Sequence, residues 1–120
     1  MSEEFKAEAR FQKAYIAILG ILHDVAKAHG YALGIHGTLG RDLDLIAVPW
    51  VEEAEDHETL VREMARVIDG KIYSIITIKK DGENVESPNP VYNPHGRVSW
   101  VINMGGGAYI DVSVTGRVIP

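Results

Sequence analysis

The sequence of 120 residues contains no cysteine, which excludes disulfide bonds and thiolate metal ligands. It also lacks an apolar run long enough to cross a bilayer, since the richest one, Ala14 to Leu22, lies inside a charged helical pattern. The acidic start at Ser2–Glu4 is unlike a secretory signal. These absences predict a cytoplasmic protein without a membrane segment.

Basic residues are in the minority, with 12 Lys and Arg against 17 Asp and Glu and a formal net charge of -5. Binding to long nucleic acids relies on a positively charged surface, so we expect no extended nucleic-acid surface. A small anionic ligand held through a metal ion is compatible with this charge. The apolar fraction of 46% is typical of a globular protein, and the length predicts a single domain over residues 1–120.

The spacing of apolar residues predicts two amphipathic helices and five strands. We expect the helices at residues 3–29 and 58–68, the first capped by Ser2 and ended by Gly30. The strands are expected at residues 31–36, 42–48, 71–80, 97–103 and 108–114. This order predicts an α+β fold in which two helices pack on one mixed or antiparallel sheet of about five strands.

Three details of this arrangement follow from the connections. The first two strands are separated by about five residues, which permits only an antiparallel hairpin. Met104–Gly107 is a glycine-rich turn that predicts a second hairpin between the last two strands. The strand at residues 71–80 is apolar on both faces, which predicts a central place in the sheet, and residues 81–96, with three prolines, predict a long loop.

Two strands of the predicted sheet carry aspartates where β-branched residues would be expected. Asp42 and Asp44 share one face of the second strand because side chains alternate, and Asp111 interrupts the apolar last strand. A buried lone carboxylate costs several kcal/mol or becomes protonated, whereas a shared divalent cation removes that cost. Three oxygen donors suit Mg²⁺ or Mn²⁺ rather than zinc.

These residues carry a resemblance to a known family. Ile35–Thr38, followed by the Asp-x-Asp of Asp42–Leu45 and by Asp111 on a later strand, resembles the signature of the nucleotidyltransferase superfamily, the fold of DNA polymerase beta. The order of helix, strand, turn, acidic strand, helix and strand is also similar. The segment RDLDLIAVPW, residues 41–50, resembles short proteins of phage and prophage genomes.

The resemblance implies a function and a set of site residues. Asp42, Asp44 and Asp111 would be the catalytic and metal-binding residues, with Asp111 activating an attacking hydroxyl. The nucleotide-binding residues would be Gly37, Thr38 and Arg41. The implied activity is transfer of a nucleotidyl group from a nucleoside triphosphate, with Mg²⁺ or Mn²⁺, to an unknown acceptor.

Two other classes of function stay open. Only Leu39, Gly40 and Arg41 separate Thr38 from Asp42, a short connection that favours a nucleotide-binding or regulatory module without chemistry. Alternatively, the aspartates form a solvated sheet face and the chain is a small assembly protein. For a chain of this size that performs chemistry, a homo-oligomer or a partner subunit is expected to complete the walls of the cleft.

Single motifs have plainer structural interpretations. An Asp-x-Asp pair is common at exposed strand positions, and Arg41 could simply neutralise it. His36–Thr38 matches the His-x-Thr element of two-histidine phosphoesterases, but the second candidate, His95–Arg97, lacks the hydroxyl residue. The glycine run before Ala108 is more simply a hairpin turn than a phosphate cradle.

Overall fold

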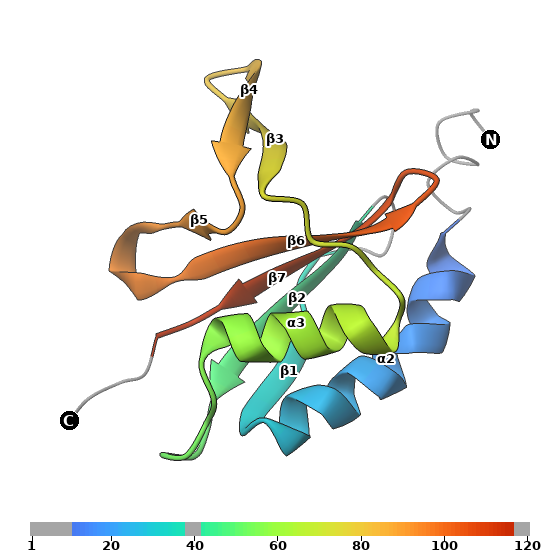
Figure 1. Cartoon of the computed structure of the whole chain (residues 1–120), viewed down its shortest axis with the longest axis vertical. Helices are drawn as coiled ribbons and strands as arrows, with labels where there is room; N and C mark the ends of the chain where they lie inside the picture. Colours follow the sequence, from blue (N-terminus) through green and yellow to red (C-terminus); the bar gives the residue numbers. More distant parts are fainter. Residues whose placement is uncertain (1–10, 38–41, 117–120) are drawn as a thin grey trace.

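The computed structural model describes residues 11–37 and 42–116 and shows an α+β fold (Figure 1). Two helices, α2 (Gln12–Ala28) and α3 (His57–Val67), accompany a mixed sheet of five strands, which confirms the predicted fold class. The strands of this sheet are β1 (Tyr31–Ile35), β2 (Asp42–Pro49), β5 (Val91–Tyr92), β6 (Val98–Gly105) and β7 (Ala108–Val114). A second sheet contains only β3 (Ile75–Lys80) and β4 (Glu83–Pro88).

The five-stranded sheet has the order β1-β2-β7-β6-β5. The pairs β1–β2 and β6–β7 are antiparallel, which confirms both predicted hairpins. The central pair, β2 and β7, is parallel although the two strands lie far apart in the sequence. This crossover brings the acidic second strand and the last strand side by side.

Both helices cover the same face of the sheet (Figure 1). Leu43 and Leu45 of β2 and Ile110 and Val112 of β7 point into this face and are fully or almost fully buried. The alternate residues of the same strands point to the opposite side, which we call the open face. The sheet therefore has one apolar side under the helices and one side free to carry polar groups.

The helix ends follow their local sequence. Asp56 caps α3, because its carboxylate accepts a hydrogen bond of 2.8 Å from the Thr59 N–H. Gly30, with φ of +88°, follows α2 and reverses the chain into β1, as predicted. The predicted start of the first helix near residue 3, and its cap Ser2, lie outside the described residues. Of the helices that the structure describes, none is long and apolar enough to span a membrane.

The structure corrects the prediction for residues 71–96. The strand is β3, which is shorter than expected and lies outside the main sheet, and residues 81–96 are not a long loop. A two-residue turn, Asp81–Gly82, with both residues at positive φ, joins β3 to β4, and β5 and a short 3₁₀ helix, Pro94–Gly96, follow. The apolar run of β3 resembles a buried strand in sequence, but among the described residues its one partner strand is the polar β4.

Candidate active site on the open face of the sheet

The acids of β2 point to the open face. Leu43, Leu45 and Ala47 are buried under the helices, while Asp42 is exposed and Asp44 is partly buried on the other side. This alternation is what a strand with one covered face requires. Both carboxylates therefore face away from the hydrophobic core, in the arrangement that the sequence pattern suggests.

The structure places Asp111 directly beside Asp44. The two residues are partners in the parallel pairing of β2 and β7, and Tyr109 is the partner of Asp42 one step earlier. Neighbouring strands are about 4.8 Å apart, so side chains of paired residues on one face are in close reach. The three predicted acids thus gather on one small area of the open face.

The proximity of these carboxylates changes their acidity. Burial, followed by the negative charges of Asp44 and Asp42, raises the pKa of Asp111 to about 6, whereas Arg97 acts in the opposite direction. The pKa of Asp44 is raised by burial and by Asp42, and His36 opposes this shift. Burial and mutual repulsion thus disfavour the charged forms of Asp44 and Asp111, and a bound cation would favour them.

The structure describes only one of the three residues predicted to bind the nucleotide. Gly37 lies next to the acids, since a Cβ atom built on it would be 3.7 Å from Oδ2 of Asp44. Its φ of +77° is the left-handed conformation that favours glycine. The preceding residue, His36, donates its backbone N–H to the Asp44 carbonyl at 2.7 Å. Thr38 and Arg41 lie outside the described residues, so their predicted roles rest on the sequence alone.

The acids open onto a cleft of about 1000 Å³. Asp42 and Asp111 lie in its lining together with Tyr109, Val101 and Asn103 of the open face. The opposite wall is formed by β3, Glu86 of β4 and Tyr73. We call β3, β4 and their turn, residues 75–88, the arm; it projects from the body of the molecule (Figure 1).

Two sets of hydrogen bonds, one between backbones and one from a side chain, anchor the root of the arm to β6. Lys71 and Asn103 exchange backbone hydrogen bonds of 2.8 and 2.7 Å. At the other end, the side-chain amide of Asn89 accepts from the Val101 N–H at 3.1 Å and donates to the Val101 carbonyl at 3.0 Å and the Tyr73 carbonyl at 2.8 Å. Since Val101 is the strand partner of Asp111, the anchor of the arm lies one strand away from the acids.

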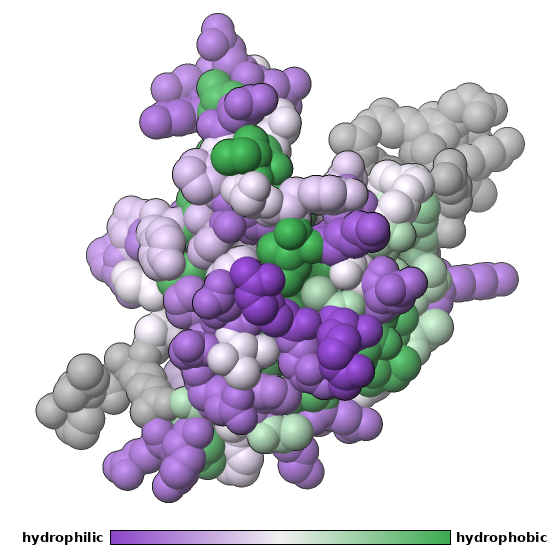
Figure 2. Space-filling model, in the orientation of Figure 1, coloured by the Kyte–Doolittle hydropathy of each residue, from purple (hydrophilic) through white to green (hydrophobic). Residues whose placement is uncertain are grey.

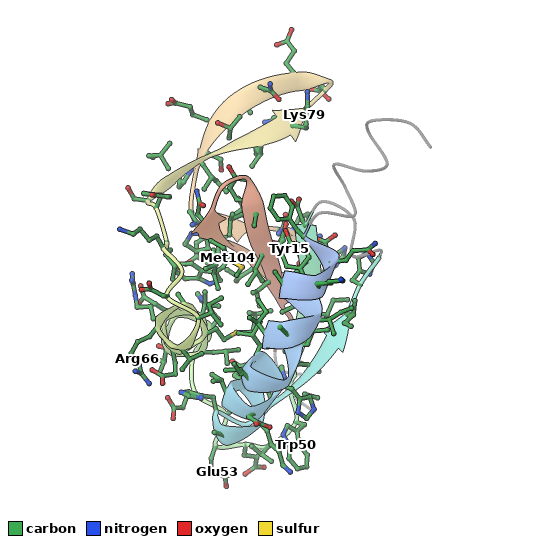
Figure 3. All side chains as sticks on the ribbon, turned by 90° about the vertical axis from the view of Figure 1, so that its right-hand side faces the viewer. Tyr15, Trp50, Glu53, Arg66, Lys79 and Met104 are labelled. Carbon is green, nitrogen blue, oxygen red and sulfur yellow. The ribbon has the colours of Figure 1, made fainter. Side chains whose placement is uncertain are left out.

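A tyrosine supports the site from the helical side. Tyr15 of α2 is fully buried, and its hydroxyl oxygen accepts a hydrogen bond of 3.3 Å from the Tyr109 N–H (Figure 3). Burial raises the pKa of Tyr15, the hydrogen bond from Tyr109 lowers it, and the charges of Asp42 and Asp44 raise it again. Tyr15 therefore stays neutral and links the start of α2 to the strand that carries Asp111.

Sequence reasoning missed the roles of Asn89, Tyr15 and Arg97. Asn89 lies in a segment that was expected to be a loop, and Tyr15 is part of an ordinary apolar stripe. For Arg97, the available signal was the two-residue period of the strand, which places it on the same face as Val101. Each role depends on a tertiary contact that spacing along one strand or helix does not report.

The described side chains do not form a metal centre by themselves. Within residues 11–37 and 42–116, no three His, Asp or Glu side chains are grouped closely enough to hold a metal ion. No protein-family model matches this sequence, and neither does any curated protein. The function must therefore be inferred from the geometry of the site.

Proposed function

We propose that this protein is a metal-dependent nucleotidyltransferase that uses a nucleoside triphosphate, with an acceptor that carries a hydroxyl group. The observation that carries the proposal is the register of β2 and β7, which pairs Asp44 with Asp111 and sets Asp42 beside them, with Asp42 and Asp111 in the lining of the cleft. Clustered carboxylates next to a cleft suit divalent ions that hold phosphate groups. The resemblance of Ile35–Thr38, Asp42–Leu45 and Asp111 to the nucleotidyltransferase signature supports the same function.

The donor set fits Mg²⁺ or Mn²⁺ bound together with the nucleotide. Mg²⁺ is commonly held by one or two carboxylates plus substrate phosphates and water, so a cluster of three protein ligands is not required. Asp42 and Asp44 are the proposed ligands, and all their donor atoms are oxygens. A bound ion would neutralise phosphate charge and orient the triphosphate for an in-line displacement.

Asp111 is proposed to accept the proton of the attacking hydroxyl. A general base is most effective when its pKa lies near the working pH, and burial together with the neighbouring acids brings the pKa of Asp111 to about 6. Asp111 lines the cleft opposite the arm, so an acceptor bound in the cleft would be able to contact it. Gly37, at positive φ beside Asp44, permits close approach of an anion to the backbone.

The proposal is tested by thermal unfolding with Mg²⁺ alone, with each of ATP, GTP, CTP and UTP alone, and with both together. We expect the largest rise in melting temperature for one nucleotide with the metal, because a ligand at 100 times its Kd stabilises by about 2.7 kcal/mol, or on the order of 10 °C. Asp44→Asn should abolish the rise. Asp24→Asn, an exposed aspartate on α2, is the matched control and should leave it intact.

A nucleotide-binding module without catalysis is the second candidate. It is favoured by the short connection between Gly37 and Asp42, which leaves four residues to contact the phosphates. Release of pyrophosphate from the bound nucleotide, measured across a panel of hydroxyl acceptors, separates the two functions. Binding without release for any acceptor would favour the module, while a protein that responds to neither metal nor nucleotide would contradict both.

A further inference from the structure

The arm presents a strand edge that the described residues do not pair. β3 is joined to β4 over six residue pairs, and within residues 11–37 and 42–116 no other strand pairs with it. An isolated two-stranded hairpin is marginally stable in water, and its free edge is a template for another strand. The arm is therefore a surface that gains stability when something covers it.

The register identifies which backbone groups point outward. Pro88 has no N–H and stands opposite Ile75, so this is a pair without mutual hydrogen bonds. In agreement, the Ser74 carbonyl accepts a hydrogen bond of 2.8 Å from the Asn89 N–H on the β4 side. Because bonded and non-bonded pairs alternate, Ile75, Thr77 and Lys79 direct their N–H and carbonyl groups away from β4.

The two edges of the arm differ in their protection. On the β4 edge, the outward positions are Pro88, Glu86 and Asn84, and proline and charge are common means of preventing strand addition. The β3 edge has Ile75 and Thr77 before Lys79, and the Ile75 side chain is 55% exposed. Figure 2 shows hydrophobic surface on the arm below a hydrophilic tip. The β3 edge is thus the one suited to pairing.

We propose that a second copy of this chain pairs with the arm, β3 against β3 in antiparallel orientation and centred on Thr77, to form a four-stranded sheet. This register is self-complementary: Thr77 faces Thr77, Ile76 faces Ile78 of the second copy, and Ile75 faces Lys79. Cross-strand pairs of threonines and of β-branched residues stabilise a sheet, and no like charges are opposed. A two-fold interface of this kind closes as a dimer.

The pairing also completes the charge of the cleft. Lys79 of each copy lines its own cleft near the tip of the arm (Figure 3), and the antiparallel register carries the Lys79 of the second copy to the level of Ile75, at the root, as an additional cation. Ile75 lines the cleft of Asp42 and Asp111, so a lysine paired with Ile75 lies at the border of that cleft. On the basis of the proposed function, each copy thereby supplies a phosphate-binding cation to the other.

The dimer is tested by analytical ultracentrifugation of two matched variants. Thr77→Pro removes an outward N–H of β3 without removing a bond of the β3–β4 ladder, and Glu86→Pro does the same on the β4 edge. We expect a dimer for the wild type and for Glu86→Pro, and a monomer for Thr77→Pro. Circular dichroism and thermal unfolding show whether both variants remain folded.

Amide hydrogen exchange gives a second measurement that needs no variant. In the dimer, the N–H groups of Ile75, Thr77 and Lys79 are protected from exchange, in addition to the N–H groups that bond to β4. The proposal is overturned if the wild type stays monomeric at every concentration and these three amides exchange rapidly. The β3 edge would then be available to pair with an extended segment of a different protein. Loss of the dimer in both proline variants would contradict the proposal that the two copies pair through the β3 edge.

The contribution of the lysine is tested by mixing variants. Lys79→Ala should bind nucleotide and Mg²⁺ about tenfold more weakly than the wild type, and Asp44→Asn, which removes a proposed metal ligand, should not bind them. In mixed dimers the second variant donates its lysine to the intact acids of the first, so the mixture should show tighter binding than either alone. If a mixture that forms dimers binds nucleotide no more tightly than either variant alone, the result contradicts the proposed role of Lys79. If the wild type binds no nucleotide, the proposed function fails while sedimentation still decides the dimer.

Discussion

At the scale of single residues, Asp111 combines a partly buried carboxylate with two acidic neighbours. Its pKa of about 6 lies above the ordinary value of 3.8, so between these two values the folded protein binds more protons than the unfolded chain. Stability contributed by this group is therefore greatest below pH 4 and falls as the pH rises through 6. A cation bound at the site, or a substitution that removes the charge of Asp111, offsets this loss of stability.

The first prediction concerns Asp111→Asn in metal-free buffer. At pH 8 we expect the variant to unfold with about 1–2 kcal/mol more free energy than the wild type, a value that allows for screening of a partly exposed charge. At pH 4 the difference should vanish because the wild-type carboxyl is protonated. Urea denaturation at both pH values measures this. An equal gain for Asp24→Asn, on the surface of α2, would show that the effect is not local.

The second prediction concerns the anchor of the arm. Asn89→Ala leaves the N–H and carbonyl of Val101 and the Tyr73 carbonyl without their side-chain partner, and we expect a loss of about 2–4 kcal/mol. Asn93→Ala is the matched control, because Asn93 donates one short bond, to the Ser99 hydroxyl at 2.9 Å, and should cost about 1 kcal/mol. Urea denaturation compares the two, and equal losses would contradict the anchoring role.

Residue patterns alone predict part of this site. The two-residue period of β2 and the apolar neighbours of Asp111 suffice to place acids on one face of each strand. They do not show that β2 and β7 are adjacent and in register, because that pairing depends on the crossover of the whole chain. The links of Asn89 to Val101 and of Tyr15 to Tyr109 are equally long-range.

At the scale of elements, α3 depends on its first turn. Asp56 accepts the Thr59 N–H, and this hydrogen bonding lowers the pKa of its carboxyl below 3.8. The ionised carboxyl of Asp56 therefore stabilises the fold at pH values above its ordinary pKa of 3.8. This stability is lost as the pH falls through the lowered pKa of the folded protein. The helix in turn places Leu60, Val61 and Met64 in the core.

The third prediction follows from this cap. Asp56→Ala should lower the free energy of unfolding by about 1 kcal/mol at pH 7. Asp56→Asn keeps a capping side chain, so it should lower the free energy of unfolding by only about 0.3 kcal/mol. As the pH falls through the lowered pKa of Asp56, the alanine variant and the wild type should converge, since the carboxyl becomes protonated. Guanidinium denaturation across this pH range tests the trend, and a constant difference throughout it would exclude the charged cap as its cause.

The arm shows why an element can be misassigned from sequence. Ile75–Ile78 is a β-branched run typical of a buried strand, and the prolines after it favour a loop. The dipeptide Asp81–Gly82 is, however, the common two-residue hairpin turn, with both residues at positive φ as a type I′ turn requires. The polar strand β4 lacks the apolar alternation that would reveal it, because neither of its faces packs on the main core.

At the scale of the whole molecule, the body and the arm are joined at few points. The buried core consists of Ala54 and residues from the helices and the five-stranded sheet, and it includes no residue of β3 or β4. The cleft arises only because the anchors at Lys71 and Asn89 hold the arm opposite the acids. No local pattern predicts such a cleft, since it depends on where two separately paired sheets meet.

The fourth prediction separates the body from the arm. The Ser74 carbonyl and the Asn89 N–H are 2.8 Å apart, so an Asn-Gly turn can replace residues 75–88 and close the chain in a two-residue hairpin. We expect this variant to fold with a melting temperature within about 5 °C of the wild type, because no core contact is removed and a shorter loop costs less entropy. It should be monomeric and bind nucleotide more weakly, since one wall of the cleft is gone. Calorimetry and sedimentation measure both properties, and a variant that fails to fold would show that the arm belongs to the core after all.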